Sequence, residues 1–261
     1  MPVRRVRNFL LLAALIPVAA LTEEPLAVAV ASNFLSTAQE ISAAFTASTG
    51  TQVRLSSGST AKLYAQIVNG APYDVFLAAD AARPGLLLDN GLAVPGSRMT
   101  YALGSLVLWS TDSRLRGKDC RAALDAGDYR HLAIANPLTA PYGRAAREFL
   151  QASDLWEGAK SRLVFGENIS QTFQFVASGN ATLGLVASSQ LTALSPFVAT
   201  CSWPVESPGL SPILQDGVIL RRATNQHHAR SFMKFIRAPR AIEILQRSGY
   251  SVPLQSSVDA E

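Results

Sequence analysis

The stretch that decides the fold reads Leu55-Ser56-Ser57-Gly58-Ser59-Thr60-Ala61-Lys62-Leu63. It follows an alternating run, 51–55, that predicts a strand, and it leads into an apolar-periodic run, 63–68, that predicts a helix. The first N–H groups of a helix lack partners within the helix, and together with the helix dipole they favour an anion. Hydroxyl groups at this turn therefore indicate an anion site. The alternative is a Ser-rich turn that only caps the helix.

Similar junctions occur nearby in the chain. The continuous apolar run 26–31 ends at Ser32-Asn33 and is followed by helical spacing over 34–48, and a third strand, 74–79, ends at Asp80. Alternating strands and helices predict a parallel sheet with right-handed crossovers, in which ligands bind beyond the carboxyl ends of the strands. Ser32, Asn33, the 57–60 turn and Asp80 all fall at that edge.

The second half of the chain repeats this pattern. Strand 131–135 leads through a loop with Tyr142 into a helix, and strand 162–165 leads through Asn168-Ile169-Ser170 into another. Runs near 102–108 and 212–218 are interpreted as crossings between two units. The sequence thus predicts an α/β, two-lobed fold with a ligand cleft between two parallel-type sheets joined by crossing strands. Lobe 1 is expected to hold residues 26–103 and 217–261, and lobe 2 residues 104–216.

Composition indicates a globular protein with a substantial core. Of 261 residues, 48% are hydrophobic and only 16% are charged. The formal net charge of +4 comes largely from Arg4, Arg5 and Arg7, and without them 20 basic residues stand against 19 acidic ones. The charge balance therefore gives no support for a nucleic-acid partner, and we expect a monomer.

The N-terminus has the layout of a signal peptide. Arg4, Arg5 and Arg7 precede an apolar run, 9–21, and small residues near Ala20 offer a cleavage site. We expect residues 1–25 to be removed and the protein to be periplasmic; a retained membrane anchor is the alternative, although the run is shorter than the ~20 residues of a span. An oxidising compartment favours a disulfide between Cys120 and Cys201, with two unpaired thiols as the alternative.

The chemistry of the four junctions points to a small oxyanion. Their groups are hydroxyls and main-chain N–H donors, and the nearby cations, Lys62 and Arg144, fall just inside predicted helices. A dianion accepts about two hydrogen bonds per oxygen, and charge-assisted bonds are roughly twice as strong as neutral ones. Neutral donors can therefore hold such an ion.

Several segments carry a family resemblance over nearly the whole mature chain. They are Ala31-Ser32-Asn33-Phe34, Ser57-Gly58-Ser59-Thr60-Ala61-Lys62-Leu63-Tyr64-Ala65-Gln66-Ile67, Asn69-Gly70-Ala71-Pro72-Tyr73-Asp74-Val75-Phe76, Pro95-Gly96-Ser97-Arg98-Met99-Thr100-Tyr101-Ala102, Asn136-Pro137 with Ala140-Pro141-Tyr142-Gly143, and Gly249-Tyr250. At these residues the chain resembles the periplasmic molybdate-binding proteins of molybdate ABC transporters.

The resemblance implies that tetrahedral molybdate or tungstate binds between the lobes through hydroxyls and main-chain N–H groups. The implied ligand-binding residues are Ser32, Asn33, Ser59, Thr60, Tyr142 and Ile169. Of these, the implied molybdenum positions are Ser32, Thr60, Tyr142 and Ile169, which would contact the oxyanion and not a bare cation. The resemblance further implies a membrane permease as partner, no cofactor and no catalytic residue.

The chain departs from the family at Thr60 and Ala61, which stand where Ser-Gly is usual. Thr keeps the hydroxyl but is stiffer about χ1, so the change bears on affinity or anion choice. Capture is expected to proceed by lobe closure about the crossing strands, with the anion stabilising the closed state.

Two other functions are compatible with parts of the sequence. A receptor for another anion or organic acid, such as sulfate or phosphate, is the first; protonated phosphate needs an acceptor, for which Asp80 and Glu167 are the candidates. A Ser hydrolase is the second, but Gly-x-Ser-x-Gly is absent and only His131 is expected near a cleft.

Overall fold

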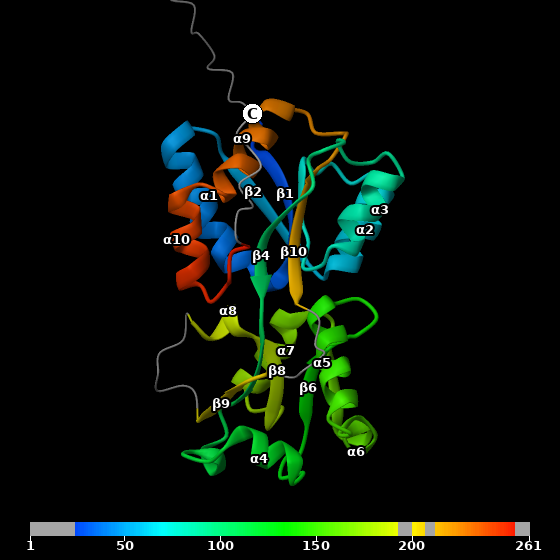
Figure 1. Cartoon of the computed structure of the whole chain (residues 1–261), viewed down its shortest axis with the longest axis vertical. Coiled ribbons are helices and arrows are strands. Elements are labelled where there is room, and N and C mark those ends of the chain that lie inside the picture. Colours follow the sequence, from blue (N-terminus) through cyan, green and yellow to red (C-terminus); the bar gives the residue numbers. More distant parts are fainter. Residues whose placement is uncertain (1–23, 193–199, 207–211, 254–261) are drawn as a thin grey trace, which may run out of the picture.

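The computed structural model describes residues 24–192, 200–206 and 212–253. Nearly all of the predicted signal peptide, residues 1–23, lies outside the described residues. Two five-stranded sheets lie one above the other along the long axis of the molecule (Figure 1), with strand orders β2-β1-β3-β10-β4 and β7-β6-β8-β5-β9. We call the first sheet with its helices lobe 1, and the second with its helices lobe 2.

Lobe 1 contains two stretches of chain. Its strands are β1 (Leu26–Ala31), β2 (Val53–Gly58), β3 (Val75–Leu77), β4 (Met99–Gly104) and β10 (Ile213–Ile219). Its helices are η1 (Ser32–Phe34), α1 (Leu35–Thr49), α2 (Thr60–Val68), α3 (Ala82–Asp89), α9 (Gln226–Ile236) and α10 (Pro239–Arg247).

Lobe 2 lies between those two stretches in the sequence. Its strands are β5 (Leu106–Ser110), β6 (Leu132–Ala135), β7 (Leu163–Gly166), β8 (Leu183–Ala187) and β9 (Cys201–Pro204). Its helices are η2 (Ser113–Leu115), α4 (Cys120–Asp125), α5 (Pro141–Ala152), α6 (Trp156–Ala159), η3 (Lys160–Arg162), α7 (Ile169–Ala177) and α8 (Ser188–Leu191). Which residues move together as two bodies remains a prediction.

Both sheets are mixed, whereas the sequence pattern favoured parallel-type sheets. β1 is parallel to β2 and β3, but β10 is antiparallel to its neighbours β3 and β4. Likewise β6 is parallel to β7 and β8, while β5 is antiparallel to β8 and β9. The reason is the connectivity. β5 and β10 are the first strands that the chain forms after crossing between the lobes, so they run away from the cleft while the other strands run toward it.

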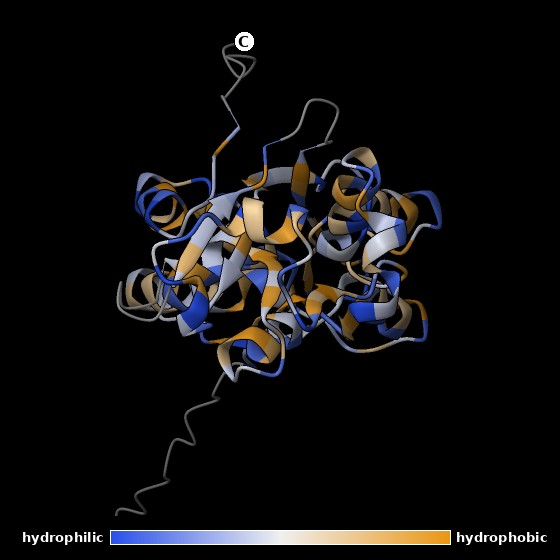
Figure 2. Ribbon diagram, turned by 90° about the horizontal axis from the view of Figure 1, so that it is seen from below, coloured by the Kyte–Doolittle hydropathy of each residue, from blue (hydrophilic) through white to orange (hydrophobic). Residues whose placement is uncertain are grey.

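Continuous apolar strands form the centre of each lobe. All six residues of β1 are buried, which explains why its sequence does not alternate. Phe45 of α1 packs edge-on against Phe232 of α9, with ring centroids 5.2 Å apart. Burying one such side chain contributes about 1.5–3 kcal/mol. The surrounding helices carry both hydrophobic and hydrophilic residues along one ribbon (Figure 2), as amphipathic helices do.

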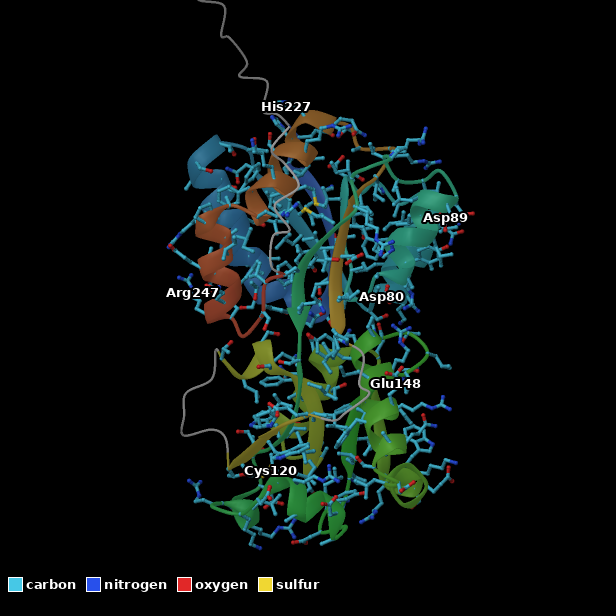
Figure 3. All side chains as sticks on the ribbon, in the orientation of Figure 1. Asp80, Asp89, Cys120, Glu148, His227 and Arg247 are labelled. Carbon is cyan, nitrogen blue, oxygen red and sulfur yellow. A yellow bond between two sulfur atoms is a disulfide. The ribbon has the colours of Figure 1, made fainter. Side chains whose placement is uncertain are left out.

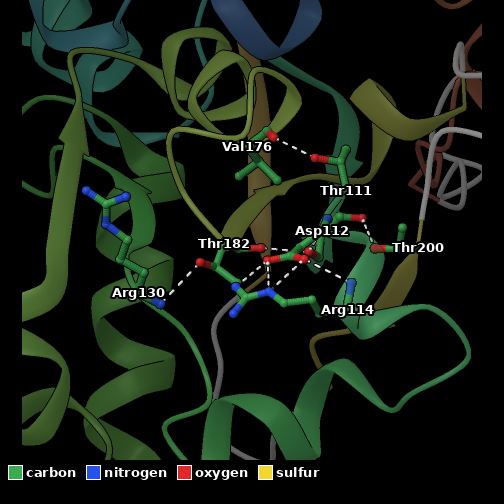
Figure 4. A network of polar contacts seen from close by, with 8 residues as sticks. Thr111, Asp112, Arg114, Arg130, Val176, Thr182 and Thr200 are labelled. Atoms are coloured by element: carbon green, nitrogen blue, oxygen red, sulfur yellow. Dashed lines mark hydrogen bonds and ion pairs between the residues drawn. The ribbon is translucent and has the colours of Figure 1, made fainter.

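The end of lobe 2 that points away from lobe 1 is closed by covalent and polar links. Cys120 of α4 and Cys201 of β9 form a disulfide, as expected for an oxidising compartment. Ser110 Oγ donates to the Thr182 carbonyl at 2.6 Å, and Thr111 Oγ1 donates to the Val176 carbonyl at 2.8 Å (Figure 4). These links hold the end of β5 against the chain that leads into β8. Across the described ranges, no helix has the length and apolar character that a membrane crossing requires.

Candidate anion site between the lobes

Four strand-to-helix junctions meet where the lobes face each other. η1 follows β1 and α2 follows β2 in lobe 1, while α5 follows β6 and α7 follows β7 in lobe 2. The structure brings all the sequence-predicted residues to one cavity there, namely Ser32, Asn33, Ser59, Thr60, Tyr142 and Ile169. The cavity has a volume of about 10 Å³, far below the roughly 300–1,000 Å³ of pockets for drug-sized molecules, so it suits only a small ligand.

The lining of this cavity holds no charged side chain. Besides the predicted residues it contains Ala31, Gly58, Ala79, Ala140, Pro141 and Asn168. Three α-helices begin at this cavity, so the positive ends of their dipoles lie next to it. The arrangement therefore favours an anion held by neutral donors, and a metal cation would find no carboxylate or imidazole ligand in the lining.

Two hydroxyl groups in the lining are buried without a partner. Among the described residues, Ser59 Oγ and Tyr142 Oη have no hydrogen-bond partner, although Ser59 and Tyr142 are each only 2% exposed. A buried polar group left unpaired costs about 1–3 kcal/mol. One hydroxyl comes from each lobe, so an oxyanion in the cavity would give both of them an acceptor.

Thr60 differs from Ser59 in this respect. Its Oγ1 accepts a hydrogen bond from the main-chain N–H of Ala79 at 3.2 Å, which ties the start of α2 to the end of β3. The family resemblance implies that the hydroxyl of this turn that binds the anion belongs to Thr60, with Ser59 beside it. In the structure Ser59 Oγ has no partner, whereas Thr60 Oγ1 accepts one hydrogen bond and keeps its own proton to donate.

The start of α7 offers a main-chain donor. Asn168 caps the helix, because its Oδ1 accepts from the N–H groups of Ser170 and Gln171 at 3.0 and 3.1 Å. Ile169 is the first residue of the helix, so its N–H has no partner within the helix and remains for a ligand. Asn168 was not among the predicted site residues, although an Asn directly before a helical pattern is a recognisable N-cap signal.

The side-chain amide of Asn33 is engaged within lobe 1. Its Nδ2 donates to Gln215 Oε1 at 2.9 Å and to Tyr250 Oη at 3.0 Å. What Asn33 can offer the cavity is therefore its main-chain N–H at the start of η1. Gln215 and Tyr250 lie 182 and 217 residues further along the chain and were not among the predicted site residues, although Gly249-Tyr250 is one of the segments that carry the family resemblance.

The phenol of Tyr142 is held in its neutral form. Burial raises its pKa well above the usual 10.0, and the nearby Tyr250 adds to that rise, while the Asn33 carboxamide acts in the opposite direction. Tyr142 is therefore a hydrogen-bond donor throughout the neutral pH range. An ionised phenolate would instead repel a dianion.

The carboxylates that were weighed as acceptors are engaged elsewhere. Asp80 forms an ion pair with Arg83 and lies 3.8 Å from Arg144, beside a second cavity that also contacts Glu148 (Figure 3). Glu167 pairs with Lys62 across the lobes at 2.7 Å. Neither carboxylate lines the anion cavity, so a ligand that needs an acceptor is poorly served there.

The expectation that His131 lies near the cleft is wrong. His131 directly precedes β6, whereas the cavity lies beyond the carboxyl end of that strand, and its Nδ1 is 3.3 Å from the Asn180 carbonyl. The position follows from the strand direction, because a residue at the start of a parallel strand faces the opposite end of the lobe. No histidine lies in the cavity lining, which removes the base that the hydrolase alternative needs.

Two lobes, an uncharged cavity between them and strands crossing from one to the other define the class of two-lobed solute-binding proteins. The chain belongs to the family described as bacterial extracellular solute-binding proteins, whose family model matches residues 26–251. This confirms the fold and the kind of protein that the sequence predicted: the family consists of exported binding proteins that serve solute transport.

Particular relatives are named for their ligand. The chain is 43% identical over 223 residues to the molybdate-binding protein ModA of Rhodobacter capsulatus, covering 85% of this chain and 86% of that protein. It is 43% identical over 225 residues to ModA of Azotobacter vinelandii, covering 86% and 89%. A solved structure of the A. vinelandii periplasmic molybdate-binding protein superposes with a TM-score of 0.83 at 38% identity, covering 88% of this chain and all of that one.

Proposed function

We propose that this protein captures molybdate, and tungstate with it, in the periplasm and delivers the anion to the membrane permease of an ABC transporter. The observation that carries the proposal is the pair of buried, unpartnered hydroxyls, Ser59 Oγ and Tyr142 Oη, which face one uncharged cavity from opposite lobes. The relatives at 43% identity that are named for molybdate support the choice of anion.

The proposed ligand shell consists of neutral donors only. Ser32, Ser59 and Tyr142 would donate hydroxyl protons, and the main-chain N–H groups of Asn33 and Ile169 would complete the shell. Thr60 would donate its hydroxyl proton as well, while its oxygen accepts from the Ala79 N–H and fixes the start of α2. Charge-assisted hydrogen bonds of this kind are short and strong, so a fully ionised dianion needs no lysine or arginine beside it.

Selection against smaller or protonated anions follows from the same shell. A protonated oxyanion carries a donor, and the lining has no carboxylate to receive it. A smaller tetrahedral anion such as sulfate would leave some of the donors with lengthened hydrogen bonds, because the donors come from fixed helix starts.

We infer that the two lobes move as two bodies, with the expected bounds, 26–103 with 217–261 and 104–216, adjusted so that Gly104 and residues 213–216 move with lobe 1, because they belong to β4 and β10. The only short link described between the lobes is Ser105, between β4 and β5, which makes it a natural hinge position. In this proposal the segment 1–25 is a signal peptide that exports the chain, and the closed receptor docks on the permease as a monomer.

Calorimetric titration of the mature chain, from residue 26 onward, with molybdate, tungstate, sulfate and phosphate at neutral pH tests the proposal. We expect tight one-to-one binding of the first two and none of the last two. Preferential binding of sulfate or phosphate would overturn the anion assignment. The absence of measurable binding with all four anions would overturn the oxyanion site itself.

A further inference from the structure

Two serine hydroxyls of lobe 2 bind consecutive main-chain carbonyls of lobe 1. Ser170 Oγ, in the first turn of α7, donates to the Ser32 carbonyl at 3.2 Å. Ser189 Oγ, in α8, donates to the Asn33 carbonyl, also at 3.2 Å. Both carbonyls belong to η1, the segment that presents the proposed donors of lobe 1, but neither serine lines the anion cavity.

The second of these contacts is part of a closed ring of hydrogen bonds. Asn33 Nδ2 donates to Tyr250 Oη at 3.0 Å, and the Tyr250 hydroxyl lies 3.0 Å from Ser189 Oγ. With Tyr250 donating to Ser189 and Ser189 donating to the Asn33 carbonyl, each hydroxyl both donates and accepts once; the Tyr250 hydroxyl also lies 2.9 Å from the Asn33 carbonyl, to which it can donate instead. Such rings strengthen each member by mutual polarisation. Only Ser189 in this ring comes from lobe 2.

Gly249, the residue before Tyr250, lies close to α8 of lobe 2. Gly249 adopts a φ of +80°, and a side-chain carbon there would lie 3.0 Å from Thr192 and 3.2 Å from Ser188 Oγ. The ring of Tyr250 packs against Phe34 of lobe 1, with ring centroids 5.4 Å apart. This packing holds the Tyr250 hydroxyl in lobe 1 even when lobe 2 moves away. Tyr250 and Asn33 thus form a preorganised acceptor for Ser189.

We propose that Ser170 and Ser189, with Tyr250 as their anchor in lobe 1, are positioning residues that hold the lobes closed over the anion and set its release rate. They do not touch the anion. When the lobes separate, both serine hydroxyls exchange their carbonyl partners for water, whereas the bond between Asn33 and Tyr250 stays within lobe 1. The inference rests on the proposed function, because it assigns a role in retaining that ligand.

The test compares Ser170→Ala and Ser189→Ala with the wild type by stopped-flow release of molybdate. Losing one net hydrogen bond of the closed state is expected to raise the release rate about threefold to tenfold, with little change in the association rate. The ratio of molybdate to sulfate affinity is expected to stay unchanged, because the anion's own donors remain. Ser178→Ala is the matched control, since that hydroxyl donates to Gln174 within α7 and lies on the surface.

Thermal unfolding separates closure from a merely structural role. Without anion, both alanine variants are expected to unfold within about 1 °C of the wild type, because their hydroxyls then meet only water. With saturating anion they are expected to lose part of the ligand-induced rise in Tm. An equal loss of Tm with and without anion would show a structural role and overturn the inference, as would a wild-type release rate.

A double-substitution cycle tests the ring itself. The effect of Ser189→Ala on release is expected to shrink in a Tyr250→Phe background, while the effect of Ser170→Ala is expected to persist there, because Ser170 lies outside the ring. Full additivity of Ser189→Ala with Tyr250→Phe would contradict the ring. If the wild type binds none of the tested anions, the proposed function itself is wrong. If the wild type binds molybdate but the variants release it at the wild-type rate, only the present inference is wrong.

Discussion

The phenolic oxygen of Tyr142 lies directly against Gly104: a β-carbon placed on Gly104 would stand only 2.0 Å from it. Gly104 is the last residue of β4, and Tyr142 is the second residue of α5 in the other lobe. The end of the crossing strand therefore forms a wall that sets how far the Tyr142 hydroxyl reaches. A side chain at position 104 would force that hydroxyl out of place.

We predict that Gly104→Ala weakens anion binding by about tenfold or more, because displacement of Tyr142 removes a charge-assisted hydrogen bond of about 1.5–3 kcal/mol. Calorimetric titration with molybdate measures the effect. Gly158→Ala in α6 is the matched control, since a β-carbon there meets no atom within 4 Å, and it should bind as the wild type does. Equal affinities for both variants would contradict the proposed contact of Tyr142 with the anion.

Substitutions at Ser59 and Thr60 should have different effects on anion affinity and on the free energy of unfolding. Ser59→Ala is expected to lower molybdate affinity about tenfold or more without lowering the free energy of unfolding, since it removes a hydroxyl that lacks a partner in the fold. Thr60→Val is expected to lower the free energy of unfolding by about 1–2 kcal/mol, because the Ala79 N–H loses its acceptor. Titration and urea unfolding of both variants check this, and the reverse pattern would leave Thr60 as the only ligand hydroxyl of this turn.

The aromatic hydroxyls near the crossing strands predict a loss of stability in alkali. Burial raises the pKa values of Tyr101 and Tyr142 well above 10.0, and burial also raises that of Tyr250. The folded state therefore keeps phenolic protons that the unfolded chain releases near pH 10. Their contribution to stability is complete below about pH 10 and falls as the pH rises toward the folded-state values.

Urea unfolding between pH 8 and 11 measures this dependence. Tyr250→Phe is expected to lower the slope above pH 10, because one such proton is removed. The partly exposed Tyr64, replaced by Phe, serves as the control. A slope that Tyr250→Phe leaves unchanged would show that this phenol does not contribute.

The disulfide should matter for stability and not for binding. It closes a loop with a sequence separation of 81 residues, for which the chain-entropy relation gives about 4.5 kcal/mol. Replacing both Cys120 and Cys201 by Ser is expected to lower the free energy of unfolding by about that amount. Cys120 lies at the end of lobe 2 opposite the cavity (Figure 3), so anion affinity at 25 °C should stay within about twofold of the wild type. A large loss of affinity would show that lobe 2 transmits strain to the site.

Local sequence patterns predicted the four strand-to-helix junctions at the site, and the family resemblance implied the individual ligand residues within them. Ser32-Asn33, Ser59-Thr60, Tyr142 and Ile169 all stand where a strand pattern gives way to a helix pattern, and the carboxyl ends of parallel strands meet at one edge of a sheet. Because helix starts leave N–H donors unpaired, the anion character of the site could also be predicted. The family assignment that these residues suggested is confirmed by the match over residues 26–251.

Long-range contacts decided the rest. The sequence placed hydroxyls at both Ser59 and Thr60, but only the tertiary structure showed that the Thr60 oxygen accepts a hydrogen bond from the main-chain N–H of Ala79. Likewise Asn33 was visible as a site residue, while its commitment to Gln215 and Tyr250 depends on chain segments some two hundred residues away. Periodicity and capping act over one or two turns, so they determined which residues reach the cleft. The partner of each hydroxyl and the strand directions of β5 and β10 depend on how the two lobes pack and connect, and only the tertiary structure fixed them.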